Sequence, residues 1–274
     1  MDAKKTIPML QQMKREGTKI VGVVAYDFQM AQVVDRAGVD FVSVGDSVGI
    51  NLWGHDTELE VTLDEMILAC RGVRRGVRRA LVSCDFPFGP LQEGVDSAVR
   101  AAIRLVKEGG ADLVKLDGAA DFPEAVRAIN RAGIPVWAQF GITPHTALRY
   151  GGMAKAGPEL STERKDQLLA QARLLEEAGA SLLDFTNSGP VAGAEVARAI
   201  GIPVIGGLGG GPWLDGRVRA AFAAVGYLAA AIDDTVTERY ANVARITLEA
   251  MKALAEDVRA SRQIRGAGAR TVST

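Results

Sequence analysis

Cysteine is scarce in this chain of 274 residues, which contains only Cys70 and Cys84. The two are not spaced like the paired cysteines of zinc-binding or redox motifs, so neither a disulfide framework nor a zinc ribbon is expected. Their scarcity is typical of a reducing compartment. We therefore expect the protein to be cytoplasmic.

The chain also lacks an excess of charge of either sign, with 32 basic and 33 acidic residues and a net charge of −1. Strong binding to nucleic acid or to a membrane surface needs a basic excess, so neither partner is expected. No segment approaches the 18 consecutive apolar residues of a membrane-spanning helix, and the first residues lack the apolar core of a signal peptide. These absences indicate a soluble, unprocessed protein that acts on a small molecule.

No stretch is rich enough in Pro, Gly or Ser to separate domains, and the length suits a single barrel of about 250 residues. Short apolar runs alternate with amphipathic helical patterns, which indicates a parallel sheet buried on both faces. An open doubly wound sheet fits this alternation too. Polar residues at the strand ends favour the barrel, because catalytic groups lie at its carboxyl-terminal rim.

We predict an α/β fold, a (β/α)8 TIM barrel with additional C-terminal helices. The prediction is one domain over residues 1–265 and a disordered tail over 266–274, with one or two helices between Thr235 and Arg262. The expected strands are Lys19 to Ala25, Phe41 to Val44, Ala80 to Ser83, Leu113 to Leu116, Pro135 to Gln139, Ser181 to Phe185, Pro203 to Gly207 and a weaker one near Ala221 to Tyr227.

Two local signals mark helix boundaries within this pattern. Thr62 and Glu65 have the spacing of a capping box at a helix start. Several helices are expected to end in a left-handed glycine just before the next strand. The glycines in this position are Gly38, Gly110, Gly133 and Gly179.

Three successive strand candidates end in an acid, at Asp46, Asp85 and Asp117. Strands of one parallel barrel present their carboxyl ends at the same rim, so these carboxylates are expected to converge. Convergent carboxylate oxygens favour a hard divalent cation.

Seven motifs, in one order, resemble the ketopantoate hydroxymethyltransferase family. Together they span roughly 150 residues, which makes the resemblance far more specific than any single motif. The motifs are Ala25-Tyr26-Asp27, Val44-Gly45-Asp46-Ser47-Val48-Gly49, Gly54-His55-Asp56-Thr57 with Val61 to Asp64, Arg74-Arg75-Gly76, Asp85-Phe86-Pro87-Phe88-Gly89, Gly110 to Gly118 and Gly141-Ile142-Thr143-Pro144-His145.

The resemblance implies roles for specific residues. Asp46 and Asp85 match aspartates that hold Mg2+, which a 2-oxo acid chelates through its keto oxygen and carboxylate. Ser47 matches the position that receives the substrate carboxylate, and Lys115 matches a lysine beside substrate and metal. Asp117 stands where the family has a glutamate that is usually reached through metal-bound water. Oxygen ligands also accept Mn2+.

The resemblance further implies that the cation stabilises an enolate, which attacks a one-carbon unit from formaldehyde or methylenetetrahydrofolate. Two departures affect this chemistry: Gln139 stands where the family has a histidine, and Thr186 stands where it has the glutamate proposed as the base. Neither side chain is a general base at neutral pH. Asp184, which shares the strand face of Thr186, and His145, in the loop after the fifth expected strand, are the candidate substitutes.

We therefore predict a Mg-dependent enzyme that forms a carbon-carbon bond on a 2-oxo acid through a metal-bound enolate, like a hydroxymethyltransferase or aldolase. One alternative is a lyase, decarboxylase or hydrolase of the phosphoenolpyruvate mutase and isocitrate lyase superfamily, although the Lys-Lys-Cys-Gly-His element of isocitrate lyases is absent. The other is a paralogue that binds metal and 2-oxo acid without catalysis. The family also implies a homo-oligomer, and the sequence leaves its symmetry, the 2-oxo acid and the one-carbon donor open.

Overall fold

The computed structural model describes residues 3–152, 162–186, 190–207 and 211–266. They belong to two compact units, one ending at Ala220 and the other beginning at Ala221, and each is described by itself. The predicted tail falls almost entirely outside the described residues, and the single domain over 1–265 stays a prediction.

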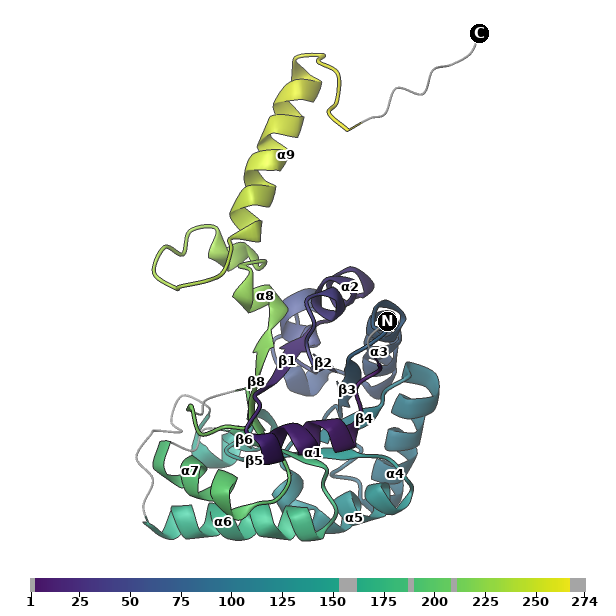
Figure 1. The fold of residues 1–274 in the computed structure, drawn as a ribbon. Coiled ribbons are helices and arrows are strands. Elements are labelled where there is room, and N and C mark those ends of the chain that lie inside the picture. The colour runs from purple at the N-terminus through teal and green to yellow at the C-terminus, as the bar shows by residue number, and fades with distance from the viewer. Residues whose placement is uncertain (1–2, 153–161, 187–189, 208–210, 267–274) are drawn as a thin grey trace. The chain divides into compact units, whose positions relative to one another are not determined.

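The first unit is a closed barrel of eight parallel strands that follow one another around the barrel in chain order (Figure 1). The last strand closes the barrel on the first, with Gly216 opposite Ile20. This topology confirms the predicted (β/α)8 fold. The strands are β1 (Ile20–Val24), β2 (Phe41–Val44), β3 (Leu81–Asp85), β4 (Leu113–Leu116), β5 (Val136–Gly141), β6 (Leu182–Thr186), β7 (Val204–Gly206) and β8 (Gly216–Ala220).

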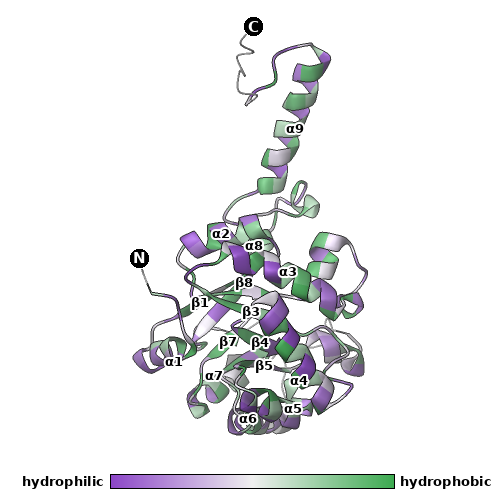
Figure 2. Ribbon diagram, turned by 90° about the vertical axis from the view of Figure 1, so that its right-hand side faces the viewer, coloured by the Kyte–Doolittle hydropathy of each residue, from purple (hydrophilic) through white to green (hydrophobic). Residues whose placement is uncertain are grey.

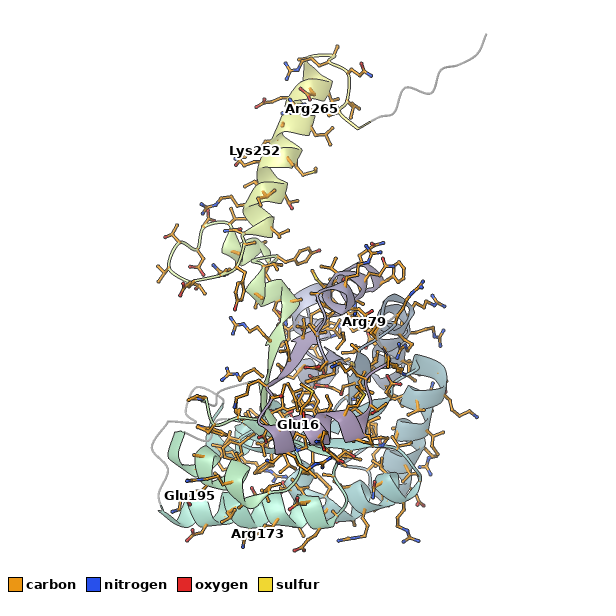
Figure 3. All side chains as sticks on the ribbon, viewed as in Figure 1. Glu16, Arg79, Arg173, Glu195, Lys252 and Arg265 are labelled. Carbon is orange, nitrogen blue, oxygen red and sulfur yellow. The ribbon has the colours of Figure 1, made fainter. Side chains whose placement is uncertain are left out.

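Helices connect most consecutive strands and carry hydrophobic and hydrophilic residues side by side (Figure 2). Charged side chains such as Arg173 lie on their outer faces (Figure 3). The capping box of Thr62 and Glu65 is confirmed, and the four predicted glycines all have φ between 81° and 92°. The helices of this unit are α1 (Ile7–Glu16), α2 (Phe28–Arg36), α3 (Leu63–Gly76), α4 (Val95–Arg104), α5 (Pro123–Arg131), α6 (Thr162–Glu177) and α7 (Pro190–Ala199).

The eighth strand lies earlier than the sequence predicted. It comprises Gly216–Ala220, whereas the predicted run near Ala221 begins with the short helix α8 (Ala221–Ala224). The observed strand alternates buried Gly216 and Val218 with exposed Arg217. An alternating strand with arginines on one face does not produce the continuous apolar run that identified the other strands.

One buried cluster fills the amino-terminal end of the barrel interior. Leu10 of α1 is fully buried and belongs to this cluster together with residues from all eight strands. Within it the ring of Phe41 meets that of Trp137 edge-on at 5.1 Å between centroids. Gly22 makes room for Phe41, because a Cβ at residue 22 would lie only 2.1 Å from the ring. Helix α1 therefore acts as a plug for this end of the barrel.

Three aspartates that directly precede strands stabilise the same end. Each accepts a hydrogen bond from an amide at the start of a neighbouring strand and pairs with a lysine from the N-terminal segment. These groups are Asp40 with the Val21 amide and Lys5, Asp112 with the Val82 amide and Lys4, and Asp215 with the Val204 amide and Lys14.

The second unit contains α8 and the long helix α9 (Val243–Arg259). Asn242 caps α9 by accepting a hydrogen bond from the Arg245 amide at 3.0 Å. The predicted helical segment from Thr235 thus begins later, because Asp234 accepts hydrogen bonds from the amides of Val236 and Thr237 and holds a turn there. In the described parts of the chain, no helix is both long and apolar enough to span a membrane.

Candidate active site

Strand alternation stacks the inward-facing side chains of the barrel in layers. Phe41, Leu81, Leu113, Trp137 and Leu182 belong to the apolar cluster at the amino-terminal end. Residues two positions later on the same strands face the same interior, and they are polar. This middle layer contains Ser43, Ser83, Lys115, Gln139 and Asp184, and Asp85, Asp117 and Thr186 follow at the carboxyl-terminal rim.

Lys115 lies between two carboxylates from different strands. Its Nζ is 3.3 Å from Asp85 Oδ2 on β3 and 3.2 Å from Asp184 Oδ2 on β6. The ammonium also lies 5.0 Å from the centre of the Trp137 ring. Burial alone would lower the pKa of Lys115, but Asp85 and Asp184 raise it well above its usual value. Lys115 therefore remains protonated.

The pKa of the Asp85 carboxyl group lies close to neutral pH. Burial raises its pKa to about 7; Lys115 opposes this rise, while the negative charges of Asp46 and Asp184 add to it. Ser43 Oγ donates a weak hydrogen bond, 3.3 Å long, to Asp85 Oδ1. Asp85 thus belongs to a group of carboxylates whose combined charge is only partly offset by the neighbouring cation.

Asp46, two residues after the end of β2, has a different cationic partner. Its Oδ2 lies 2.7 Å from Nε2 of His145, which follows β5. The edge of Phe88 packs on His145 with 5.7 Å between ring centroids. Burial alone would lower the pKa of His145, but the hydrogen bond to Asp46 and the charge of Asp117 raise it. The Asp46 and His145 pair therefore favours the protonated imidazole.

Ser47 forms a hydroxyl pair with Tyr26, a residue that follows β1. The two side-chain oxygens are 2.8 Å apart. Burial raises the pKa of Tyr26 far above its usual value, so the phenol keeps its proton and can donate a hydrogen bond. A Cβ at Gly45 would lie 3.0 Å from Ser47 Oγ and 3.8 Å from Asp85 Oδ2. The glycine therefore keeps the space between the hydroxyl and the carboxylate open.

Gln139 and Thr186 contact each other at the positions where the two family departures occur. Gln139 Nε2 donates a 2.9 Å hydrogen bond to Thr186 Oγ1 across the β5 and β6 pair. Both side chains are buried. The resulting pair is neutral and has no group that titrates near neutral pH.

Asp117 lies on the side of the rim occupied by Asp46 and His145. Burial raises its pKa, while the charge of His145 and a hydrogen bond from Thr143 lower it. Its Oδ1 is buried and has no hydrogen-bond partner among the described residues. Such an atom is costly to bury dry, so this position suits a water molecule.

The predicted site residues therefore make four sets of contacts. Lys115 joins Asp85 to Asp184, Gln139 joins Thr186, Asp46 contacts the candidate base His145, and Ser47 contacts Tyr26. Tyr26 and Ser43 were not predicted to take part. Ser43 is a polar residue in an otherwise apolar strand, two positions before the rim, and this was the only sequence signal for it.

The predicted cation site rests on Asp46 and Asp85 only. Within the described residues, no three His, Cys, Asp or Glu side chains are placed to hold one metal ion. Mg2+ commonly takes one or two carboxylates and completes its octahedron with water and substrate oxygens. The carboxylate oxygens, the raised pKa of Asp85 and the open space at Gly45 fit such an ion.

Comparison with known proteins gives a consistent result. The family model for ketopantoate hydroxymethyltransferase matches residues 4–263. The 3-methyl-2-oxobutanoate hydroxymethyltransferase of a Cyanothece species is 39% identical over 96% of this chain and 99% of its own length. The enzyme of that name from Salinibacter ruber is 40% identical over 93% of this chain and 94% of its own length.

Solved structures with low sequence identity share the fold. A putative phosphonomutase from Burkholderia cenocepacia has a TM-score of 0.62 at 16% identity, covering 93% of this chain and all of that one. A 2,3-dimethylmalate lyase of the PEP mutase/isocitrate lyase superfamily has a TM-score of 0.61 at 17% identity, covering 93% and 89%. A phosphonopyruvate hydrolase in complex with oxalate and Mg2+ scores 0.60 at 11% identity, covering 94% and 88%.

Proposed function

Because this chain belongs to the ketopantoate hydroxymethyltransferase family and is a transferase of that family, we propose that it adds a one-carbon unit to a 2-oxo acid. The reaction class is an aldol addition, in which the carbon next to the keto group becomes the nucleophile. The first substrate to test is 3-methyl-2-oxobutanoate, which forms part of the names of both relatives.

The observation that carries this proposal is the excess of carboxylate over cationic groups at the rim. Among the described residues of this cluster, the four carboxylates of Asp46, Asp85, Asp117 and Asp184 meet two cationic groups, Lys115 and a protonated His145. A divalent cation held by Asp46 and Asp85 would offset the excess. The phosphonopyruvate hydrolase of the same fold contains Mg2+ and oxalate, a small dicarboxylate.

Mg2+, with Mn2+ as an alternative, would polarise the keto group of the substrate and stabilise the negative charge that develops on it. Asp117 would act from the outer shell, through water, because its unpartnered Oδ1 suits a water molecule. An aspartate is one methylene shorter than the glutamate of the family at this position, so a bridging water is easier to accommodate than direct contact.

The remaining residues bind and orient the substrate. The hydroxyl groups of Ser47 and Tyr26, 2.8 Å apart, form a donor pair for the substrate carboxylate next to the space at Gly45. The ammonium of Lys115, held between Asp85 and Asp184, is placed to donate a hydrogen bond to an oxygen that becomes negative during the reaction. Gln139 and Thr186 line the same interior as neutral groups.

Formaldehyde or methylenetetrahydrofolate supplies the one-carbon unit in this proposal. We further propose a homo-oligomer, as the family resemblance implies, and a cytoplasmic location, which fits the two free and buried thiols of Cys70 and Cys84. Light scattering on the purified protein would measure the oligomeric state directly.

The test follows 3-methyl-2-oxobutanoate by NMR in deuterated water, with Mg2+ or with a chelator, and with or without each one-carbon donor. Mg-dependent deuterium exchange and a new hydroxymethyl product are expected. Cleavage of the 2-oxo acid would favour a lyase of the wider superfamily instead. Tight binding without exchange or product would favour a paralogue that binds but does not catalyse.

A further inference from the structure

Proton removal from the carbon next to the keto group requires an acceptor, and the two positions that departed from the family do not supply one. Gln139 and Thr186 are hydrogen-bonded to each other at 2.9 Å, and neither side chain accepts a proton from carbon near neutral pH. A carboxylate or a neutral imidazole elsewhere in the barrel interior is needed for this step.

Asp184 is the carboxylate nearest to this pair along the chain. It precedes Thr186 by two residues on β6, faces the same interior, and lies opposite Gln139 in the strand register. Its side chain is only 3% exposed. Oδ2 pairs with Lys115, whereas Oδ1 has no hydrogen-bond partner of normal geometry among the described residues. One oxygen is therefore anchored and the other is available.

Burial also makes Asp184 a stronger base than a surface carboxylate. Burial raises its pKa, and the charge of Lys115 holds this rise in check, with a smaller contribution from the Gly207 amide. An acceptor whose pKa moves toward the working pH transfers protons more effectively. Because Lys115 stays charged, Asp184 can still be ionised inside the barrel.

The other two candidates, His145 and Asp117, both interact with Asp46. His145 uses Nε2 to contact Asp46, one of the two carboxylates assigned to the cation. Asp117 interacts most strongly with His145, Thr143 and Asp46, and more weakly with Lys115. Asp184 and Asp85, by contrast, contact the same ammonium nitrogen at 3.2 and 3.3 Å. A substrate held at Asp85 therefore lies close to Asp184.

We propose that Asp184 is the catalytic base that removes the proton from the carbon next to the keto group, with Lys115 as its fixed counter-ion. This inference rests on the proposed function. The C–H bond breaks, its proton moves to Asp184 Oδ1, and its electron pair forms the enolate. The enolate carbon then bonds to the carbon of formaldehyde, and the new alkoxide takes the proton back from Asp184. Atoms and charge balance, and no oxidant or reductant is required.

The experiment measures deuterium exchange at C3 of 3-methyl-2-oxobutanoate with Mg2+, without any one-carbon donor. Asp184→Asn keeps the shape of the side chain and removes its basicity, so exchange should fall at least about 100-fold. Asp184→Glu keeps a carboxylate one methylene further out, so it should retain clearly more exchange than Asp184→Asn.

Asp40→Asn is the matched control, because Asp40 is also a buried, lysine-paired aspartate next to a strand but lies at the other end of the barrel. Its exchange rate per folded molecule should equal that of the wild type. Calorimetry with Mg2+ and the 2-oxo acid, together with thermal unfolding, shows that each variant is folded and still binds.

Two results overturn the inference in distinguishable ways. If the wild type exchanges and a folded, substrate-binding Asp184→Asn variant exchanges at the same rate, Asp184 is not the base, although the proposed function survives. If the wild type catalyses no deuterium exchange in the 2-oxo acid and forms no product, the proposed function and this inference fail together.

Discussion

The two ends of the barrel use the same residue type in opposite ways. At the amino-terminal end, Asp40, Asp112 and Asp215 each have a lysine and a backbone amide as partners. At the carboxyl-terminal rim, the carboxylates outnumber the cationic groups, and Lys115 is shared by two of them. At the amino-terminal end each of these carboxylates has a cationic partner of its own, whereas negative charge is in excess at the carboxyl-terminal rim.

This difference separates stability from chemistry. Paired carboxylates at the amino-terminal end hold α1 and the strand starts together. Crowded carboxylates at the rim have raised pKa values for Asp85, Asp117 and Asp184, which is characteristic of groups arranged to bind a cation or to move a proton. Substitutions at the amino-terminal end should therefore lower stability, and substitutions at the rim should lower activity.

The largest effect is expected at the rim. Asp85→Asn removes a proposed cation ligand, and we expect product formation to fall about 100- to 1000-fold. The thermal midpoint without cation should not fall, because the substitution relieves repulsion from Asp46 and Asp184. NMR product assays and thermal unfolding measure the two quantities. Wild-type turnover in a folded variant would contradict the assignment of Asp85.

At the other end, Asp215→Ala should cost stability instead of activity. It leaves the mostly buried ammonium of Lys14 and the Val204 amide without their shared carboxylate, and we expect a loss of about 3 kcal/mol. Urea unfolding measures the loss. Activity per folded molecule should match that of the wild type, and a selective loss of turnover would break the separation between the two ends.

The pH dependence of stability should have opposite signs at the two ends. Asp85 has a folded pKa of about 7, above its ordinary value of 3.8, so the folded state retains a proton that the unfolded state has lost. Without cation, this group therefore lowers stability as the pH rises from about 4 toward 7.

Asp35, near the start of β3, behaves in the opposite way. Burial alone would raise its pKa, but the amides of Ala80, Arg78 and Arg79 hold it below its usual value. Its stabilisation is present above its unfolded pKa and is lost as the pH falls through the folded pKa.

Unfolding free energies of the wild type, Asp85→Asn and Asp35→Asn across pH 3 to 8 test both signs. Mg2+ at about 100 times its dissociation constant should stabilise the wild type by about 2.7 kcal/mol at neutral pH. Asp85→Asn should lose most of this gain, whereas Asp35→Asn should keep it. An identical pH profile for all three proteins would contradict the contrast.

The smallest effect is expected for Lys4→Ala. The Lys4 side chain is 47% exposed, and Asp112 keeps Arg74 at 2.9 Å and the Val82 amide as partners. A solvent-exposed ion pair contributes little, so the loss should stay below about 1 kcal/mol in urea unfolding. A loss of stability as large as that of Asp215→Ala would show that solvent exposure does not determine how much each ion pair at this end contributes to stability.

Much of the fold was predictable because local rules identified its elements. Buried strands produced apolar runs, helices ended in left-handed glycines, and Thr62 with Glu65 marked a helix start, all as observed. The exception was β8, where Arg217 and Arg219 break the apolar run although the strand closes the barrel on β1. Its place was decided by pairing with β1 and not by local hydrophobicity.

The site was predictable only as a set of strand ends. The sequence identified Asp46, Asp85 and Asp117 as carboxylates of one rim, and Asp184 and His145 as candidate bases. It did not show that Lys115 contacts both Asp85 and Asp184, or that His145 contacts Asp46. These contacts join residues 30 to 99 positions apart, and only the closed barrel brings them together.

The sequence by itself determined that alternating apolar strands and amphipathic helices form a barrel with acids at the strand ends. Only the tertiary structure decided which cationic group each acid meets. Asp112 and Asp117 flank the same strand, β4, yet the first is matched by Lys4, Arg74 and an amide while the second is buried beside His145, Thr143 and Asp46. The energy of a carboxylate depends on the charges and dipoles around it, and these come from distant parts of the chain.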